Sequence, residues 1–477
     1  MNWLDYAIFV LYMLGLIAMG YYFHRRNETA EDYFVGGRSI SAGHVGLSVA
    51  ATDVGGGFSI GLGGLGYSMG LSGNWLLFTG LVGAWMSAVF IIPRLKRVDT
   101  AHGMMTFPDF LRFRYDGRVA LVAAVISALG YLGFTSGQIL AGAKLMSGTM
   151  VTWAPSGTSQ MTFSVLLIGV VIVAYTVLGG LKAVIYTDTV QWILLMVGLA
   201  AFAIPLTLVE VGGLTGLRES LPAGHLSLTR VDFVTLVNWF ITIAPIWVVG
   251  MTLYQRMFAT RSVRDAQKAW FIAGLFEWPA MAFAGVGLGM MSRVLFPAID
   301  PELGIPMLLT TVLPAGIAGI VVASYFSAVM STADSCLIAS SGNAVGDLLQ
   351  RGRWRVSEDG LVRVSKLATL VLGLGAVALA LSFTAVLDAI LQAYAFLVAG
   401  LFIPTLGAYF WRRGTALGAF WGMLAGGGTT LTLLITGIEP PFGLDPSFWG
   451  ILVSFLVFVP VSLLQSEVWT LEEAPGD

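Results

Sequence analysis

The sequence predicts an all-α polytopic membrane protein with about thirteen transmembrane helices. Two observations predict this fold class. Of the 477 residues, 57% are hydrophobic and only 11% are charged, whereas a soluble domain carries about 25% charged residues. The chain also contains apolar runs of about 20 residues, the length that a helix needs to cross a bilayer. These runs begin near Trp3, Val45, Trp75, Val119, Phe163, Leu181, Val234, Ala266, Pro314, Val362, Val386, Ala416 and Phe448.

The first span begins at Trp3, and we expect it to be retained with the N-terminus outside the cell. Asp5 stands where a cleaved signal peptide carries positive charge, and Arg25 and Arg26 follow the span directly. With this orientation, cytoplasmic loops hold 21 of the 25 Lys and Arg residues, Arg256 among them, and the opposite side holds three. This asymmetry indicates a plasma-membrane protein whose C-terminus is cytoplasmic.

Composition excludes several other classes of protein. The net charge of −2 and the absence of a basic segment exclude a nucleic-acid partner. Cys336 is the only cysteine and the chain has four histidines, so neither a disulfide nor a histidine-rich metal site is expected. No intramembrane acid accompanies a nucleophile or a metal-ligand set, so we do not expect an enzyme. Residues 107–118 mix aromatic and charged side chains and predict a short interfacial helix.

Ionisable residues inside the spans are the first candidates for a functional site, because charged groups are costly in hydrocarbon. A structural role as a hydrogen-bonding or snorkelling group is an equally good interpretation of any single one. Lys144 and Asp388 lie near predicted span ends and fit that structural role better. The candidates are Asp53, Lys144, Asp188, Glu277, Asp334 and Asp388.

The second span contains an acid followed by three adjacent glycines, Asp53 to Gly57. Each glycine destabilises a helix by about 1 kcal/mol relative to alanine. We therefore expect the span to unwind here, which would free backbone carbonyls to line a cavity or bind a cation. The alternative is close packing of small residues between helices.

The ninth span carries small and hydroxyl side chains on one helical face. Ala328, Ser331, Thr332 and Ser335 are spaced i, i+3, i+4 and i+7. Hydroxyl and carbonyl oxygens suit a hard cation. A contact between helices through small residues is the alternative interpretation.

These residues resemble the sodium/solute symporter family, which includes sodium-coupled proline, pantothenate, sugar and choline transporters. The resemblance extends from the first loop to the ninth span and is nearest to the proline, pantothenate and choline types. The matching stretches are EDYFVGGRS (31–39), the glycine run 53–57, GLVGAW (80–85), TFPDFLRFRY (106–115), YTVLGGLKAVIYTDTVQ (175–191) and SAVMSTADS (327–335).

The resemblance implies a leucine-transporter-type fold, with two inverted five-helix repeats whose first helices are discontinuous. The interruptions would lie at Asp53 to Gly57 and around Ile243 to Ile246, where Pro245 removes a backbone donor. The chain would form one transmembrane domain, 1–477. Its expected parts are the first helix and loop (1–44), the first repeat (45–207), the second repeat (234–411) and the C-terminal helices with a short tail (412–477).

The resemblance also implies a sodium ion as the coupling ion. Carried over residue by residue, the sodium ligands would be the carbonyls of Ala51, Val54 and Ala328 and the hydroxyls of Ser331 and Thr332. A second ion would involve Asp188, Asp334 and Ser335.

Substrate contacts are expected from the broken helices and their neighbours, although core packing explains each side chain as well. Trp247 and Tyr254 together would suit a cationic group. The full set of candidates is Asp53, Phe58, Phe134, Gln138, Trp247, Tyr254 and Gln392.

The expected function is sodium-coupled symport of a small organic solute of the amino-acid, betaine, choline or carboxylate type. The expected partners are this solute, sodium and the lipid bilayer, without an obligatory protein partner. Proton-coupled symport on the same fold is the main alternative, and a uniporter or channel is a weaker one.

Overall fold

The computed structural model describes residues 1–24, 35–176, 181–342, 345 and 358–465. These residues form a bundle of helices, and the parts of the sequence motifs at 31–34 and 177–180 lie outside the described residues. The helices up to α10 are α1 (Trp3–His24), α3 (Ala42–Asp53), α4 (Gly55–Met69), α5 (Trp75–Met86), α6 (Ile92–His102), α7 (Phe107–Arg114), α8 (Gly117–Thr149), α9 (Gln160–Thr176) and α10 (Leu181–Val197). The later helices are α11 (Ile204–Glu210), α12 (Gly213–Ser220), α13 (Phe233–Ile243), α14 (Ile246–Val249), α15 (Met251–Ala259), α16 (Val263–Leu275), α17 (Ala282–Leu295), α18 (Gly304–Thr311), α19 (Ile317–Gly342), α20 (Glu358–Ala380), α21 (Val386–Phe410), α22 (Ala416–Thr436) and α23 (Pro446–Leu463).

Nine helices within the described residues are long and apolar enough to cross a membrane, or ten if the bent pair around Gly250 is one span. The run Gly55–His102 counts once in this total, although the turn Gly70–Asn74 divides it. Shorter apolar stretches, Trp3–Leu16 and Gln160–Ala174, add to these. The prediction of an all-α polytopic protein is confirmed, and the number thirteen stays a prediction.

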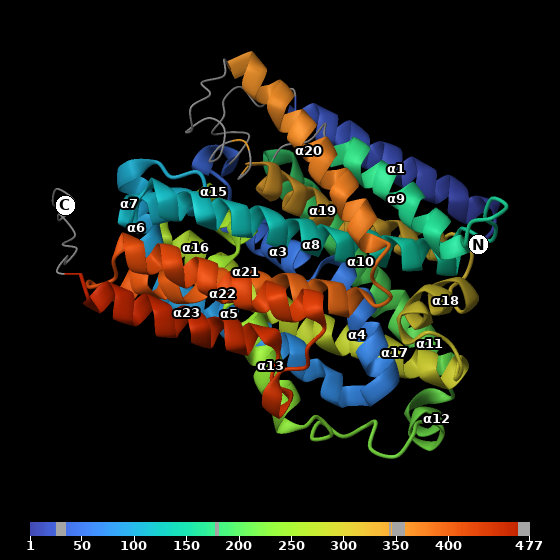
Figure 1. The fold of residues 1–477 in the computed structure, drawn as a ribbon. Helices are drawn as coiled ribbons and strands as arrows, with labels where there is room; N and C mark the ends of the chain where they lie inside the picture. The colour runs from blue at the N-terminus through green and yellow to red at the C-terminus, as the bar shows by residue number, and fades with distance from the viewer. Residues whose placement is uncertain (25–34, 177–180, 343–344, 346–357, 466–477) are drawn as a thin grey trace.

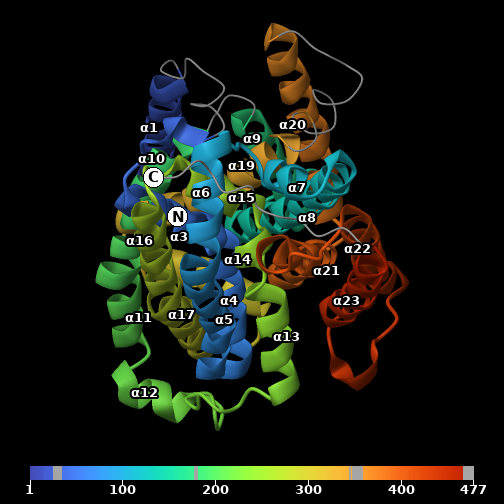
Figure 2. The ribbon, with the colours of Figure 1, turned by 90° about the vertical axis from the view of Figure 1, so that its left-hand side faces the viewer.

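The helices differ strongly in how far they are buried. The apolar stretch of α19 is 89% buried, whereas that of α20 is 22% buried. Accordingly, α19 lies in the centre between α8 and α10, while α22 and α23 lie side by side at one edge (Figures 1 and 2). The side chains of α19 are therefore placed where they can meet residues from many other helices.

The chain begins and ends its helical part at opposite ends of the bundle. In Figure 1, α1 starts at the right-hand end and α23 finishes at the left-hand end. This arrangement fits an odd number of crossings. Which end faces the cytoplasm stays a prediction, as does the division into repeats 45–207 and 234–411.

The interfacial helix expected at residues 107–118 is shorter than predicted. Helix α7 begins at a capping box, in which Thr106 accepts from the backbone of Asp109 and the Asp109 carboxylate accepts in return. It ends at Arg114. Asp116 then accepts hydrogen bonds from the first turn of α8, so a new helix begins before residue 118.

The second span is interrupted between Asp53 and Gly55, at the start of the glycine run. Helix α3 ends at Asp53 and α4 begins at Gly55, whose φ of +47° favours glycine. Gly56 and Gly57 follow in the first turn of α4, where the lack of a side chain permits close packing. A Cβ on Gly56 would lie 2.1 Å from a methyl of Val329 in α19. The interruption and the close packing that the sequence left as alternatives therefore both occur, at neighbouring glycines.

The second interruption has two parts. Helix α13 ends at Ile243, and Pro245 caps the short helix α14, as the sequence predicts. The larger bend, 43°, lies at Gly250, whose ψ of 114° is extended. The prediction around Ile243 to Ile246 thus finds the first part and misses the second, because Pro245 fits the start of a helical turn without a large change of direction.

Candidate ion and solute site

The interrupted second span meets the hydroxyl face of α19 beside its break. Oγ1 of Thr332 lies 3.1 Å from the carbonyl oxygen of Ala51 and 3.0 Å from that of Ala328. The structure therefore brings together three of the five predicted sodium ligands. A Cβ on Gly55 would lie 2.3 Å from this hydroxyl, so glycine is required for the approach.

The other two predicted ligands have protein partners. The carbonyl of Val54 accepts a hydrogen bond of 3.1 Å from the backbone N–H of Phe58. The hydroxyl of Ser331 donates to the carboxylate of Asp188 on α10. Ser331 thus points into the bundle, next to Thr332 and on the side of Asp188.

An ion pair buried among the helices adjoins this site. Asp188 accepts hydrogen bonds from Ser48 and Ser331, and it pairs with Arg256 of α15 at 3.2 Å. Both side chains of the pair are fully buried. The guanidinium group of Arg256 donates to Ser48, Thr52, Asp188, Thr252 and Ser335. This network joins α3, α10, α15 and α19 in one polar cluster.

Arg256 is a functional candidate that the sequence analysis missed. The charge distribution predicts a cytoplasmic loop position for Arg256, which is wrong because its side chain is fully buried in α15. Its position soon after the second interruption is a signal in the sequence. Its partners Asp188 and Ser335, however, lie 68 and 79 residues away along the chain.

The residues predicted for a second ion have protein partners. Ser335 accepts from Arg256 at 3.1 Å. Asp334 is buried and accepts a hydrogen bond from Thr176 on α9. Asp188 stands between Ser331 and Arg256, and a second-ion role for these residues stays a prediction.

Four of the predicted substrate residues surround the break in the second span. Oδ1 of Asp53 accepts a hydrogen bond of 3.1 Å from the hydroxyl of Tyr394. The Tyr394 ring stacks on Phe134 with centroids 4.9 Å apart and lies 6.0 Å from Phe58. Gln138 accepts a hydrogen bond of 3.0 Å from the backbone of residue 57, next to Phe58. This set forms a buried aromatic and polar cluster beside the break.

The remaining three predicted substrate residues are Trp247, Tyr254 and Gln392. Trp247 packs on Trp270, and Tyr254 packs on Phe107, and a shared aromatic wall of the two stays a prediction. The side chain of Gln392 is exposed. Two residues further along the same helix point to nearly opposite faces, and Tyr394 takes the buried position that the prediction gave to Gln392.

Glu277 is a second acid at this site. Its carboxyl group adjoins that of Asp53. It belongs to a π-helical segment, Phe276–Met281, between α16 and α17. A Cβ on Gly80 of α5 would lie 2.5 Å from its Oε2 atom. The sequence analysis noted Glu277 as an intramembrane acid but could not place it beside Asp53, which is 224 positions earlier in the chain.

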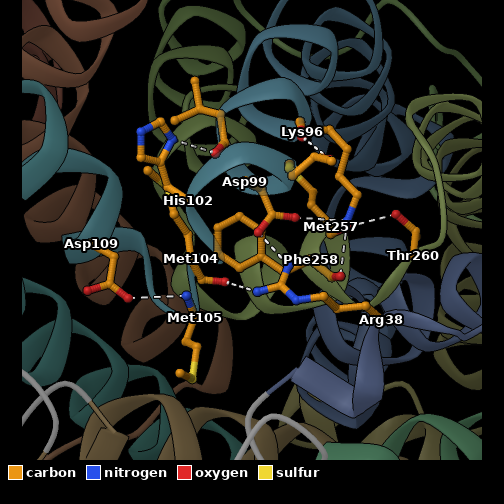
Figure 3. Close-up of polar contacts among 12 residues, drawn as sticks. Arg38, Lys96, Asp99, His102, Met104, Met105, Asp109, Met257, Phe258 and Thr260 are labelled. Carbon is orange, nitrogen blue, oxygen red and sulfur yellow. Dashed lines mark hydrogen bonds and ion pairs between the residues drawn. The ribbon is translucent and has the colours of Figure 1, made fainter. Parts of the chain in front are cut away.

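A polar cluster ties the loop before α3 to the ends of α6 and α15 (Figure 3). Arg38 forms an ion pair with Asp99 and donates to the carbonyl of Met104 at 2.6 Å. Lys96 pairs with the same Asp99 at 2.9 Å and donates to the carbonyl of Phe258. Arg38 of the EDYFVGGRS motif thus has a structural role at this end.

A second set of ion pairs lies near the C-terminal end of α8, around the buried side chain of Lys144. Lys144 pairs with Asp300 at 2.8 Å and with Glu302 at 2.7 Å. The Glu302 carboxylate also accepts from the backbone N–H groups of Val386 and Leu387, at the start of α21. This pairing agrees with the interpretation of Lys144 as a structural residue near a span end.

The comparison with protein families identifies the chain. The profile of the sodium:solute symporter family matches residues 33–426. The chain belongs to the sodium:solute symporter family. Sodium-coupled symport is the class of activity that membership in this family supports, and the apolar helices agree with a multi-pass membrane protein.

Curated relatives with this family's activity align with most of the chain. The high-affinity proline transporter PutP of Bacillus subtilis is 28% identical over 437 residues, which cover 89% of this chain and 91% of that protein. The sodium/myo-inositol cotransporter 2 of Oryctolagus cuniculus is 28% identical over 474 residues, covering 88% of this chain and 68% of that protein. These relatives carry different solutes, so the solute of this family member does not follow from them.

Solved structures of transporters share its fold. A Na+-coupled sialic acid symporter in a substrate-bound outward-open state matches with a TM-score of 0.80 and 19% identity, covering 98% of this chain and all of that one. Mhp1, a nucleobase-cation-symport-1 family transporter, matches with a TM-score of 0.59 and 15% identity, covering 91% and 95% of the two chains. The leucine-transporter-type fold that the sequence resemblance implies is confirmed.

Proposed function

We propose that this protein moves a small organic solute across the membrane together with sodium, by alternating access. The observation that carries the proposal is the contact between the Ala51 carbonyl, at the end of α3, and the Thr332 hydroxyl of α19. A sodium ion held by the oxygens of Ala51, Val54, Ala328, Ser331 and Thr332 would link these two helices. A state in which the helices are close then binds the ion more tightly than a state in which they are apart.

The direct test is the effect of sodium on the thermal stability of the purified protein. Sodium that binds only the folded protein raises the melting temperature in a concentration-dependent way. We expect Thr332→Ala to raise the half-saturating sodium concentration about tenfold, which corresponds to a loss of about 1.4 kcal/mol of binding free energy. Ser331→Ala should act in the same direction.

Ser324→Ala is the matched control. Ser324 is a buried serine of the same helix, and its hydroxyl donates to the carbonyl of Ile320 in the preceding turn. Its removal should leave the sodium response unchanged. An unchanged sodium response in both Ser331→Ala and Thr332→Ala would refute the proposed ion site.

Proton coupling is a second candidate, favoured by the burial of Asp334, which accepts a hydrogen bond from Thr176. The two mechanisms differ in what drives uptake into proteoliposomes. A sodium gradient at equal pH should suffice for the proposed mechanism, whereas uptake driven by a pH gradient in sodium-free buffer would favour proton coupling.

A further inference from the structure

The carboxyl groups of Asp53 and Glu277 form a buried acidic pair between the two interrupted spans. Asp53 is the last residue of α3, directly before the first interruption. A Cβ on Gly80 would lie 2.5 Å from Oε2 of Glu277 and 3.7 Å from a methyl of Ile243, the last residue of α13 before the second interruption. The pair thus lies beside the first interruption and near the end of α13.

Three of the four carboxyl oxygens of this pair accept no hydrogen bond from an N–H or hydroxyl group of the described residues. Of the four carboxyl oxygens, Oδ1 of Asp53 accepts from Tyr394. Oδ2 of Asp53 and both oxygens of Glu277 accept from no N–H or hydroxyl group among the residues that the structure describes, and the two carboxyl groups have each other as polar neighbours. Arg256, a buried cation near Asp53, is already paired with Asp188. Buried acceptors and charges without partners are costly, so the site is incomplete as the protein alone forms it.

A buried donor without a partner lies on the same face of α5. Gly80 and Gly83 are one helical turn apart, and a Cβ on Gly83 would lie 2.7 Å from Cδ1 of Trp247. The adjoining Nε1 atom of this indole has no acceptor within the described part of the chain. Nε2 of Gln138, which lies beside residue 57, has none either. Unpaired acceptors and unpaired donors therefore flank the same interruptions.

We propose that Asp53 and Glu277 bind the positively charged nitrogen of the transported solute, and that this nitrogen carries N–H groups, as in a primary or secondary ammonium or a guanidinium. N–H groups would supply donors to these three carboxyl oxygens, which a quaternary ammonium cannot do. The rings of Phe58, Phe134 and Tyr394 beside Asp53 suit a cation of this kind. This inference rests on the proposed function as a solute symporter.

The test is a thermal-shift series at saturating sodium, with solutes matched in shape and different at the nitrogen. The N–H solutes are ethanolamine, glycine and L-proline; choline, betaine and proline betaine are their methylated counterparts, and ethylene glycol and glycolate lack the nitrogen of the first two. We expect stabilisation by at least one N–H solute, and at least tenfold weaker half-saturation by its methylated or nitrogen-free counterpart. Glu277→Gln should weaken the binding of that solute at least tenfold.

Glu219→Gln, at an exposed position in α12, is the control and should bind the solute as the wild type does. The rise in melting temperature on adding sodium, measured without solute, shows that Glu277→Gln is folded and tests the ion site separately. If sodium fails to stabilise the wild type, the proposed function fails; if sodium stabilises it and the solute results differ from those above, only this inference fails.

Three results would overturn the inference. The first is a melting-temperature shift with the N–H solutes that is absent or no larger than the shift with glycolate, ethylene glycol or the methylated compounds. The second is unchanged solute binding in Glu277→Gln. The third is a loss of the pH dependence of uptake in Glu277→Gln at unchanged half-saturation, which would make the pair a proton site.

Discussion

Gly55→Ala is the substitution whose effect follows most directly from the geometry. The φ of +47° at this residue costs an alanine about 1–2 kcal/mol. The new Cβ would also lie 2.3 Å from Oγ1 of Thr332, where ordinary contacts begin at 3.4 Å, so the hydroxyl must move by about 1 Å. Overpacking of this kind costs about 1–3 kcal/mol.

The displaced hydroxyl is one of the proposed sodium ligands, so part of this strain lowers the free energy gained on binding sodium. If about 1.4–2.8 kcal/mol falls on the sodium-bound state, the half-saturating sodium concentration rises about tenfold to a hundredfold. The assay is sodium titration of purified protein, followed by the melting temperature. Gly43→Ala is the control, because that glycine of α3 has open space around its Cβ position. A Gly55→Ala protein that titrates like the wild type would refute the reasoning.

Two further predictions concern the buried ion pairs. Asp188→Asn leaves Arg256 buried without its counter-charge, so we expect a loss of about 3–5 kcal/mol of stability and weaker sodium binding. The double variant Asp188→Asn/Arg256→Met should have a higher melting temperature than Asp188→Asn alone. A lower melting temperature of the double variant would contradict this. Lys144→Met should cost less, about 1–3 kcal/mol, because Glu302 keeps the backbone donors at Val386 and residue 387; a larger loss than in Asp188→Asn, measured by thermal unfolding, would contradict it.

The sequence predicts the fold class well because its signals are local. Apolar length and charge asymmetry report spans directly, and the glycine run marks the first interruption. The same run cannot show that only Gly55 adopts the left-handed conformation while Gly56 faces Val329, because that depends on the position of α19. Likewise, Pro245 is visible in the sequence, but the bend at Gly250 depends on how α15 packs.

The site is predicted less completely, because its contacts join distant parts of the chain. The hydroxyl face of α19 follows from helical spacing, and the structure directs Thr332 to Ala51 as expected. Which partner Ser331 selects is a tertiary property, and it is Asp188. The burial of Arg256 is invisible to a count of charges, since its partners come from three other helices.

Saturable binding of radioactive sodium to the purified protein tests the central claim most directly, because it needs no knowledge of the solute. We expect saturable binding to the wild type, retained in Ser324→Ala and weakened at least tenfold in Thr332→Ala. Equal binding by Thr332→Ala and the wild type, or no saturable binding by the wild type, would contradict a sodium ion between α3 and α19.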